Sequence, residues 1–295
     1  MSDFRSKVFQ SVAKNLSFTM ASLELLVSQP AITKHIQELE ATYQTRLFDR
    51  QGSKISLTES GRLLLEHCER ILEDYKRLEY EMHLLHNEYI GELKLGASTT
   101  IAQYVLPPLL GSFIGKFPQV NLSLLNGNSR EIEAALQEHR IDLGLVEGVF
   151  RLPNLKYTTF LEDELVAVVH SKSRLQLPEE ITPQDLPAIP LVLRERGSGT
   201  LDVIERSLQK HGVKLSSLHV LMYLGSTESI KLFLENSDCM GIVSIRSICK
   251  ELAAGTFRVV EIKDMPMLRD FCFVQLQGQE GGLSQAFMNY MFMSR

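Results

Sequence analysis

The sequence predicts a multidomain protein of the α plus α/β class, with an N-terminal winged helix-turn-helix, a long linker helix and a C-terminal two-lobed α/β region. Three observations support this prediction. Apolar residues recur at helical spacing in the first 57 residues, a heptad repeat follows, and strand and helix patterns alternate from Gly91 onward. We therefore divide the chain into residues 1–57, 58–90 and 91–295.

Composition places any nucleic-acid contact near the start of the chain. The 295 residues are 44% apolar and 23% charged, which is ordinary for a globular protein. The net charge of −5 provides no global attraction for nucleic acid. Residues 1–62 carry eight Lys or Arg against six Asp or Glu, whereas residues 63–90 carry three against seven. The basic excess is therefore local.

The sequence gives no sign of export, membrane insertion or metal binding. The opening "MSDFRSKVFQ" lacks the apolar run of a signal peptide, so we expect a cytoplasmic protein. Residues 95–115 are uncharged, but three consecutive hydroxyls and the pair Pro107-Pro108 favour a strand and a buried helix over a membrane span. The four cysteines form no C-x-x-C motif or zinc spacing, so we expect free thiols and neither metal nor cofactor.

The first 57 residues predict three helices. The first covers 4–14. Ser17 is placed to cap a second helix over 19–25. A third begins at Ser28 or Gln29 with Pro30 in its first turn, where the missing N–H of proline has no cost. Its predicted buried stripe is Ile32, Ile36, Leu39 and Tyr43.

The polar residues of the third helix are candidates for DNA contacts. Two helices, a tight turn and a polar outer face are typical of a helix-turn-helix, although a small helical bundle would show the same periodicity. Two short extended pieces follow around Gly52 and Ser53 and predict a wing with basic residues near its tip. The candidate DNA-binding residues are Ser28, Gln29, Pro30, Thr33, Lys34, Gln37, Arg50 and Lys54.

Three motifs in this segment carry a family resemblance. They are "SQPAITK" at 28–34, "RLFDR" at 46–50 and "LTESG" at 57–61. In this order they resemble the winged helix-turn-helix of LysR-type transcriptional regulators. Thr33 and Lys34 stand where that family more often has serine and arginine, and lysine lacks the planar fork that reads guanine. The resemblance implies double-stranded DNA, a small-molecule effector and RNA polymerase as partners.

Residues 58–90 predict a long helix with one narrow apolar seam. Thr58 is placed to cap it. The seam has steps of four and three residues with charged flanks, which favours pairing with a second copy over packing on its own domain. The resemblance implies the same, in a homodimer or homotetramer. The predicted dimerisation residues are Leu64, Cys68, Ile71, Tyr75, Leu78, Met82 and Leu85.

From Gly91 the pattern predicts two α/β lobes with a cleft between them. One strand-helix unit runs to about residue 161 and a second begins near Glu162. The resemblance implies a periplasmic-binding-protein-like fold whose final strand returns to the first lobe. This gives lobe I as 91–161 and 268–295, and lobe II as 162–267.

Two hydroxyl-rich segments at predicted strand ends are candidates for the effector site. Ser98, Thr99 and Thr100 open one helix, and Gly197, Ser198, Gly199 and Thr200 open another. Ligands of open α/β sheets bind beyond the carboxyl ends of strands, so these segments are expected to face the cleft. The alternatives are simple N-capping for the first and an ordinary turn for the second. Thr227 is a lesser candidate.

Glu147 ends another predicted strand and bears on the charge of the effector. Its carboxylate would repel an anion unless Arg194, Arg196 or a ligand ammonium compensates it, and it could instead face water. An anionic or amino-acid-like effector is therefore expected. No catalytic motif is present, so the main hypothesis is a non-enzymatic regulator. The alternatives are a solute-binding or transport-accessory protein and an enzyme on the same lobes.

Overall fold

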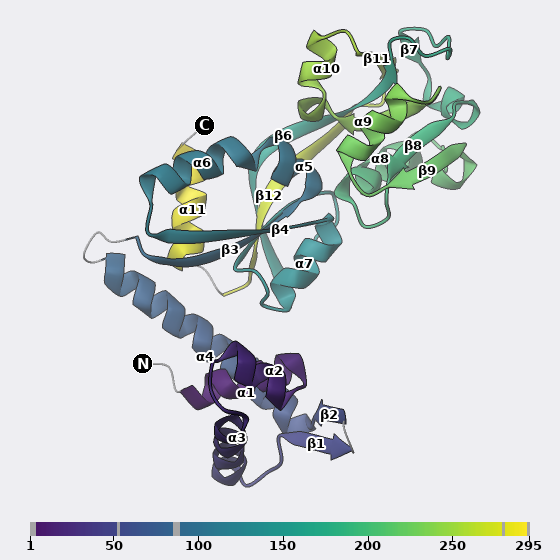
Figure 1. Ribbon diagram of the computed structural model, residues 1–295. Helices are drawn as coiled ribbons and strands as arrows, with labels where there is room; N and C mark the ends of the chain where they lie inside the picture. Colours follow the sequence, from purple (N-terminus) through teal and green to yellow (C-terminus); the bar gives the residue numbers. More distant parts are fainter. Residues whose placement is uncertain (1–3, 52–53, 85–88, 279–280, 294–295) are drawn as a thin grey trace. The chain divides into compact units, whose positions relative to one another are not determined.

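The computed structural model describes residues 4–51, 54–84, 89–278 and 281–293 (Figure 1). The chain divides into two compact units, Met1–Glu88 and Tyr89–Arg295. The first is small and mostly helical, and the second is built on a mixed sheet.

The N-terminal unit begins with three helices, as predicted. They are α1 (Phe4–Asn15), α2 (Phe18–Glu24) and α3 (Gln29–Tyr43). Ser17 caps α2 by accepting the N–H of Met20 at 3.2 Å, and Ser28 caps α3 by accepting the N–H of Ala31 at 3.4 Å. The turn between α2 and α3 contains Leu26 at a φ of 54°. Hydroxyl caps therefore fix the N-terminal end of each helix of the helix-turn-helix.

The three helices bury one apolar core. Val8, Phe9, Val12, Ile32 and Ile36 are all fully buried in it. The prediction that Tyr43 extends the stripe of α3 is wrong, because Tyr43 is the last helical residue and its side chain is 55% exposed. The chain then turns away at Gln44, whose φ is 51°.

Two short strands form the predicted wing and lead into the long helix. Strands β1 (Phe48–Gln51) and β2 (Lys54–Leu57) are antiparallel, with Gln51 opposite Lys54. Helix α4 (Glu59–Leu84) follows, and Thr58 caps it by accepting the N–H of Gly61 at 3.0 Å. A Cβ on Gly61 would lie 2.2 Å from the carbonyl oxygen of Leu47, so the glycine of "LTESG" permits this close approach.

The seam of α4 divides into two parts. Cys68 is only 3% exposed in the core of its own unit, so the prediction that it contacts a partner is wrong. Leu64 packs against the same core but is only partly buried. Farther along, Ile71, Leu78 and Met82 are about half exposed. Leu85 lies outside the described residues. The apolar repeat therefore serves the domain core first and leaves an uncovered stripe beyond it.

The second unit is built on one continuous sheet with strand order β4-β3-β5-β12-β6-β10-β8-β9. Two long strands, β6 (Leu155–His170) and β12 (Met267–Leu276), pair antiparallel along their length and run from one lobe to the other (Figure 1). Strand β12 also pairs with β5 of the first lobe, so the final strand returns to lobe I as the resemblance implied.

The described part of lobe I carries three parallel strands and four helices. The strands are β3 (Gly91–Ser98), β4 (Val120–Gly127) and β5 (Leu143–Glu147). The helices are α5 (Thr99–Tyr104), α6 (Leu106–Lys116), α7 (Ser129–Gln137) and α11 (Gly282–Met293). We expected one helix after Ser98, but the chain breaks at Val105 because Pro107 and Pro108 fit only in the first turn of a new helix.

Lobe II repeats the pattern with more short elements. Its parallel strands are β8 (Leu191–Arg194), β9 (Val220–Leu224) and β10 (Met240–Ser244), and β7 (Glu180–Ile181) and β11 (Phe257–Ile262) complete the sheet. The helices are α8 (Gly199–Lys210), α9 (Thr227–Glu235) and α10 (Cys249–Ala253). Three 3₁₀ turns are η1 (Pro183–Ala188), η2 (Leu215–Ser217) and η3 (Ile245–Ser247). Among the helices of the described ranges, none is long and apolar enough to cross a membrane.

Candidate effector site and nucleic-acid interface

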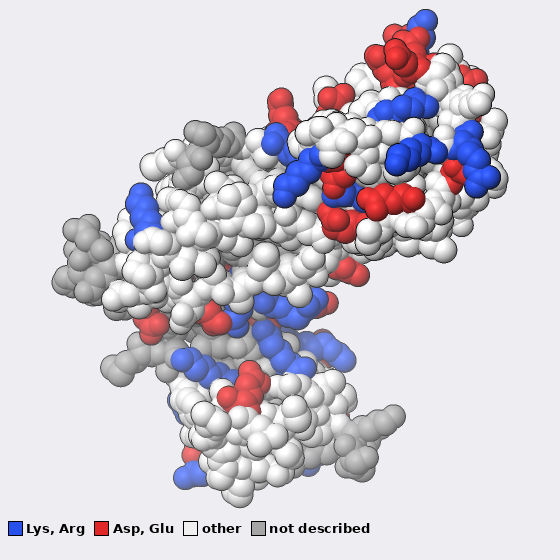
Figure 2. Space-filling model, turned by 45° about the horizontal axis from the view of Figure 1, so that its top comes forward, with Lys and Arg blue, Asp and Glu red and all other residues white. Residues whose placement is uncertain are grey.

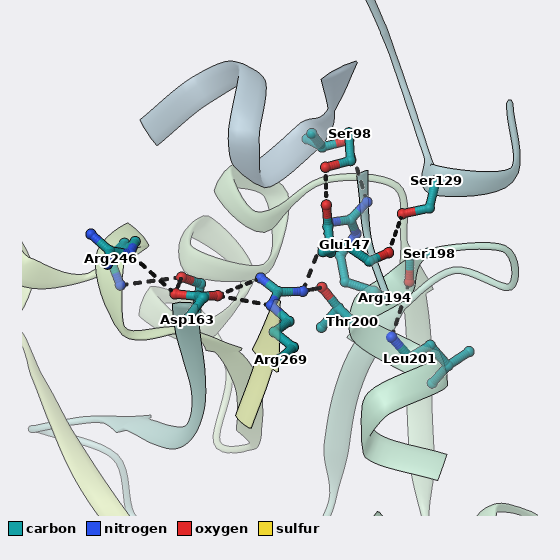
Figure 3. A network of polar contacts seen from close by, with 12 residues as sticks. Ser98, Ser129, Glu147, Asp163, Arg194, Ser198, Thr200, Leu201, Arg246 and Arg269 are labelled. Atoms are coloured by element: carbon teal, nitrogen blue, oxygen red, sulfur yellow. Dashed lines mark hydrogen bonds and ion pairs between the residues drawn. The ribbon is translucent and has the colours of Figure 1, made fainter. Parts of the chain in front are cut away.

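Polar side chains gather where the parallel strands of both lobes end. Ser98 and Glu147 end β3 and β5 in lobe I, and Arg194 and Ser244 end β8 and β10 in lobe II. All four are almost fully buried. Figure 3 shows Ser98, Glu147 and Arg194 in a network of polar contacts that extends to Asp163 of β6. This is the place where open α/β sheets bind ligands.

The first hydroxyl-rich segment points into this network. The Ser98 hydroxyl does not cap α5 but donates to the Glu147 carboxylate, so simple N-capping is excluded for Ser98. Thr99 Oγ1 accepts from Nη2 of Arg194 at 3.3 Å, across the two lobes. Thr100 is fully buried, and its Oγ1 has no hydrogen-bond partner among the described residues.

The second segment meets the backbone of the same residue, Glu147, from the other lobe. Ser198 caps α8 by accepting the N–H of Leu201 at 3.2 Å, so its role is local. A Cβ on Gly199 would lie 1.9 Å from the carbonyl oxygen of Glu147, so only glycine allows this contact between the lobes. Thr200 accepts a hydrogen bond from Arg269 at 2.9 Å, and Gly197 accepts the N–H of Arg130 at 3.3 Å.

Glu147 lies between the two segments and is 3% exposed, so it does not face water. Its carboxylate is 3.5 Å from Nη1 of Arg269 and accepts from Ser98. Arg196, one of the two arginines expected to pair with it, is exposed. Burial raises the pKa of the Glu147 carboxyl, and the guanidinium groups of Arg269 and Arg194 only partly oppose that effect.

The network continues into lobe II through an ion pair that the sequence did not reveal. Arg269 of β12 contacts Asp163 of β6 with Nε and Nη2, each at 2.8 Å. Asp163 also accepts from the Ser244 hydroxyl at 2.7 Å and lies 3.6 Å from Nε of Arg246 (Figure 3). The one available signal was a charged pair, Arg269 and Asp270, inside a strand pattern that is otherwise apolar.

A second polar contact joins the lobes at α5 and α9. The Tyr104 hydroxyl donates to Glu228, and Lys231 bonds Glu228 at 2.9 Å and Glu251 at 2.5 Å. Burial, followed by the hydrogen bond to Glu228, raises the pKa of Tyr104, so the phenol stays neutral. Thr227, the lesser candidate, is buried at the start of α9 beside this contact.

The predicted DNA contacts lie on the outer side of α3. Ser28, Gln29, Pro30 and Gln37 are exposed, Thr33 is partly exposed and bonds its own helix backbone, and the Lys34 side chain is 76% exposed. The side chains of Arg50 and Lys54 lie outside the described part of the wing. Figure 2 shows basic and acidic side chains intermixed over lobe II, so that face offers no single-sign surface.

Comparison with known families decides the identity of these parts. Residues 86–292 match the model of the LysR substrate binding domain, and residues 5–62 match that of the bacterial regulatory helix-turn-helix protein, lysR family. The chain belongs to the LysR family of transcriptional regulators. The two matches cover the winged helix-turn-helix and the two-lobed unit, and they exclude the solute-binding and enzyme alternatives.

Individual relatives of this LysR-type regulator agree with the family assignment. The chain is 34% identical to the HTH-type transcriptional regulator YeiE of Escherichia coli (strain K12), over 87% of this chain and 85% of YeiE. It is 28% identical to the Synechocystis PCC6803 CcmR regulatory domain in complex with 2-PG, with a TM-score of 0.62 over 69% of this chain and 97% of that chain. Full-length CbnR complexed with target DNA shares the fold, with a TM-score of 0.63 at 22% identity over 100% of both chains.

The contact between Gly199 and Glu147 gives a test of the closed arrangement of this LysR-type regulator. We expect Gly199→Ala to lower the free energy of unfolding by about 1–3 kcal/mol, because the added methyl group overlaps the Glu147 backbone. Urea unfolding followed by circular dichroism would measure the change. Gly225→Ala is the control, because nothing lies within 4 Å of a Cβ there. Equal stability of the two variants would contradict a close contact.

Proposed function

We propose that this LysR-type regulator binds a small anionic or amino-acid-like effector between lobes I and II and that the effector controls its action on DNA. The supporting observation is a set of buried polar atoms without partners. Thr100 Oγ1 and Nη1 of Arg194 are both buried at facing strand ends, and neither has a hydrogen-bond partner among the described residues. Buried donors are normally paired, so a bound ligand explains them.

The comparison with CcmR supports a small molecule as a ligand of the two-lobed unit. The regulatory domain of CcmR was solved with 2-PG and matches the two-lobed unit of this chain. In this chain the segments Ser98–Thr100 and Gly197–Thr200 converge on Glu147, as proposed for an effector site. The effector therefore has donors and acceptors available from both lobes.

The effector site is tested by replacing Thr100 with valine, which keeps the side-chain shape and removes the hydroxyl. Hydrogen bonds to charged groups contribute about 1.5–3 kcal/mol, so we expect affinity to fall about tenfold or more. Calorimetry with 2-PG and with metabolites selected by thermal shift would measure it. The control is Thr158→Val, which makes the same change at a partly buried threonine in strand β6. Unchanged effector affinity in Thr100→Val would mean that the effector does not bind at Thr100.

We propose that α3 and the wing carry the DNA contacts, with the regulator acting in the cytoplasm beside RNA polymerase. The exposed side chains of Gln29 and Gln37 can bond base edges, whereas Lys34 is a point charge suited to phosphate. The Lys34 ammonium lies 4.0 Å from the Glu38 carboxylate. An exposed ion pair of this length is weak, so it leaves Lys34 available to DNA.

DNA binding should separate into phosphate and base contacts. We expect Lys54→Ala to weaken binding to all sequences and to reduce the salt slope by about one, because one phosphate contact is lost. Gln29→Ala should instead change base preference. Gel-shift titrations at several salt concentrations measure both, with Lys210→Ala in α8 as the control. Identical salt slopes and equal losses on operator and random DNA for the first two variants would refute this assignment.

We propose that the outer part of α4 pairs two copies of the chain into a homodimer, which can assemble further into a homotetramer. The support is the stripe of Ile71, Leu78 and Met82, which is about half exposed in one chain although its residues are apolar. Such a stripe at heptad spacing is typical of a two-helix contact. Leu64 and Cys68 are left out, since they are used within their own unit.

Charges introduced into the stripe should separate the copies. Ile71→Asp with Leu78→Asp would bury unpaired carboxylates in the dimer, at a cost of several kcal/mol. Sedimentation velocity should show a smaller species that binds operator weakly. Leu268→Asp in strand β12, 69% exposed in the wild type, is the control. An unchanged sedimentation coefficient in the double variant would mean that α4 does not hold the dimer.

A further inference from the structure

The buried charges around the proposed effector site do not balance evenly. Arg269 is paired with Asp163 through two contacts of 2.8 Å. Arg194 is paired with its neighbour Glu195, which accepts from Nε at 2.8 Å and from Nη2 at 3.0 Å. Each buried guanidinium thus has its own carboxylate. Glu147 remains as an additional carboxylate without a cation of its own.

The described contacts of the Glu147 carboxylate include little compensating charge for a buried anion. It accepts a hydrogen bond from the neutral hydroxyl of Ser98, and Arg269 reaches it only at 3.5 Å. An ionised carboxylate in such a place is costly unless it is paired, and the usual response is to take up a proton. Burial accordingly raises the pKa of Glu147.

Two buried donors in the neighbouring segments lack partners. Nη1 of Arg194 and Oγ1 of Thr100 have no hydrogen-bond partner in the described part of the chain, and both residues are at most 1% exposed. Arg194 bonds Thr99, the residue before Thr100, so its guanidinium reaches the segment that also contains Ser98, and it acts electrostatically on Glu147. A guanidinium N–H and a hydroxyl suit an oxyanion rather than an ammonium group.

We propose that Glu147 takes up a proton when a small oxyanion binds to Arg194 and Thr100, so that anion and proton enter the site together. The proposal rests on the inter-lobe effector site of the preceding section and specifies its ligand as an oxyanion. The proton comes from solvent and is held on the Glu147 carboxyl. An ammonium-bearing effector would have the opposite effect, because it would keep Glu147 ionised.

The surroundings of Glu147 leave it as the group that titrates. Strand β6 presents Asp163, which is held by Arg269, Arg246 and Ser244. Strand β12 presents Arg269 and strand β8 presents Arg194, both cationic. Helix α8 presents Gly199 and Thr200, helix α7 presents the Ser129 hydroxyl to the Glu147 carbonyl at 2.7 Å, and Ser98 leads into α5.

Farther from Glu147, two more titratable side chains influence this side of the site. Tyr104 and Glu228 are bonded to each other, and Arg194 acts electrostatically on Tyr104. The pKa of Tyr104 is raised by burial, and the hydrogen bonds from Tyr104 and Lys231 hold the pKa of Glu228 low against the effect of burial. Neither changes its charge when the pH rises from weakly acid to weakly alkaline.

Sulfate tests the proposal on the full chain, because it stays a dianion and any proton taken up must come to the protein. Calorimetry in two buffers of different ionisation enthalpy, from about pH 5 to about pH 8, counts protons per sulfate. Sodium chloride keeps the ionic strength constant. We expect uptake of about one proton above the pKa of Glu147, and an affinity that falls about tenfold for each further pH unit.

Three variants complete the experiment. Glu147→Gln keeps the shape of the side chain and should bind sulfate with no proton uptake and no pH dependence. Arg194→Gln should lose sulfate binding at every pH. Glu92→Gln, an exposed glutamate on β3, should behave as wild type. Thermal unfolding of each variant, followed by circular dichroism, shows that it is folded at the pH of the measurement.

The outcomes separate this inference from the effector site itself. Sulfate binding by wild type without proton uptake would overturn the role of Glu147, while loss of binding in Arg194→Gln would still support the inter-lobe site. Proton uptake that persists in Glu147→Gln would assign the proton to another group and also overturn it. Absence of sulfate binding in both wild type and Glu147→Gln would overturn the oxyanion site, and the DNA assays would remain an independent test of regulator function.

Discussion

The arrangement of the second unit depends on the ion pairs and hydrogen bonds of one buried guanidinium group, that of Arg269. It lies on one of the two strands that cross between the lobes and holds Asp163 on the other. Its remaining nitrogen contacts Thr200 from lobe II and Glu147 from lobe I. Because these groups are shielded from water, an error in the position of any one would leave a buried charge unpaired. The crossing strands, the two strand ends and the first turn of α8 are therefore fixed together.

The N-terminal unit uses a different physical device. Its core is apolar, and its helix ends are set by hydroxyl caps at Ser17, Ser28 and Thr58. On α3, Ser28 serves as the cap and Thr33 bonds the helix backbone. The exposed side chains of Lys34 and Gln37 lie outside the apolar core, so these positions can vary without loss of the fold.

Local patterns predicted this fold well because its signals are local. Caps, prolines in first turns and alternating strands marked most helices and strands, and the two hydroxyl-rich segments do converge as expected. The failures have a common cause, which is tertiary contact. Cys68 satisfies the heptad spacing but lies where α4 still covers its own domain, and Tyr43 continues the helical period past the end of the core. The partnership of Arg269 with Asp163 and Glu147 joins residues more than one hundred positions apart, and no spacing rule contains it.

The position of β12 has a consequence for synthesis of the chain on the ribosome. This strand lies between β5 and β6, yet it is among the last segments to be translated. Until it emerges, β5 is paired with β3 on one side and open on the other, the β6 residues that pair with β12 lack their partner, and the covering helix α11 has not been made. The nascent chain therefore exposes unpaired strand edges, a state that favours aggregation or chaperone binding. The helix-turn-helix has no such dependence, because the described residues of its core cluster lie between Val8 and Cys68.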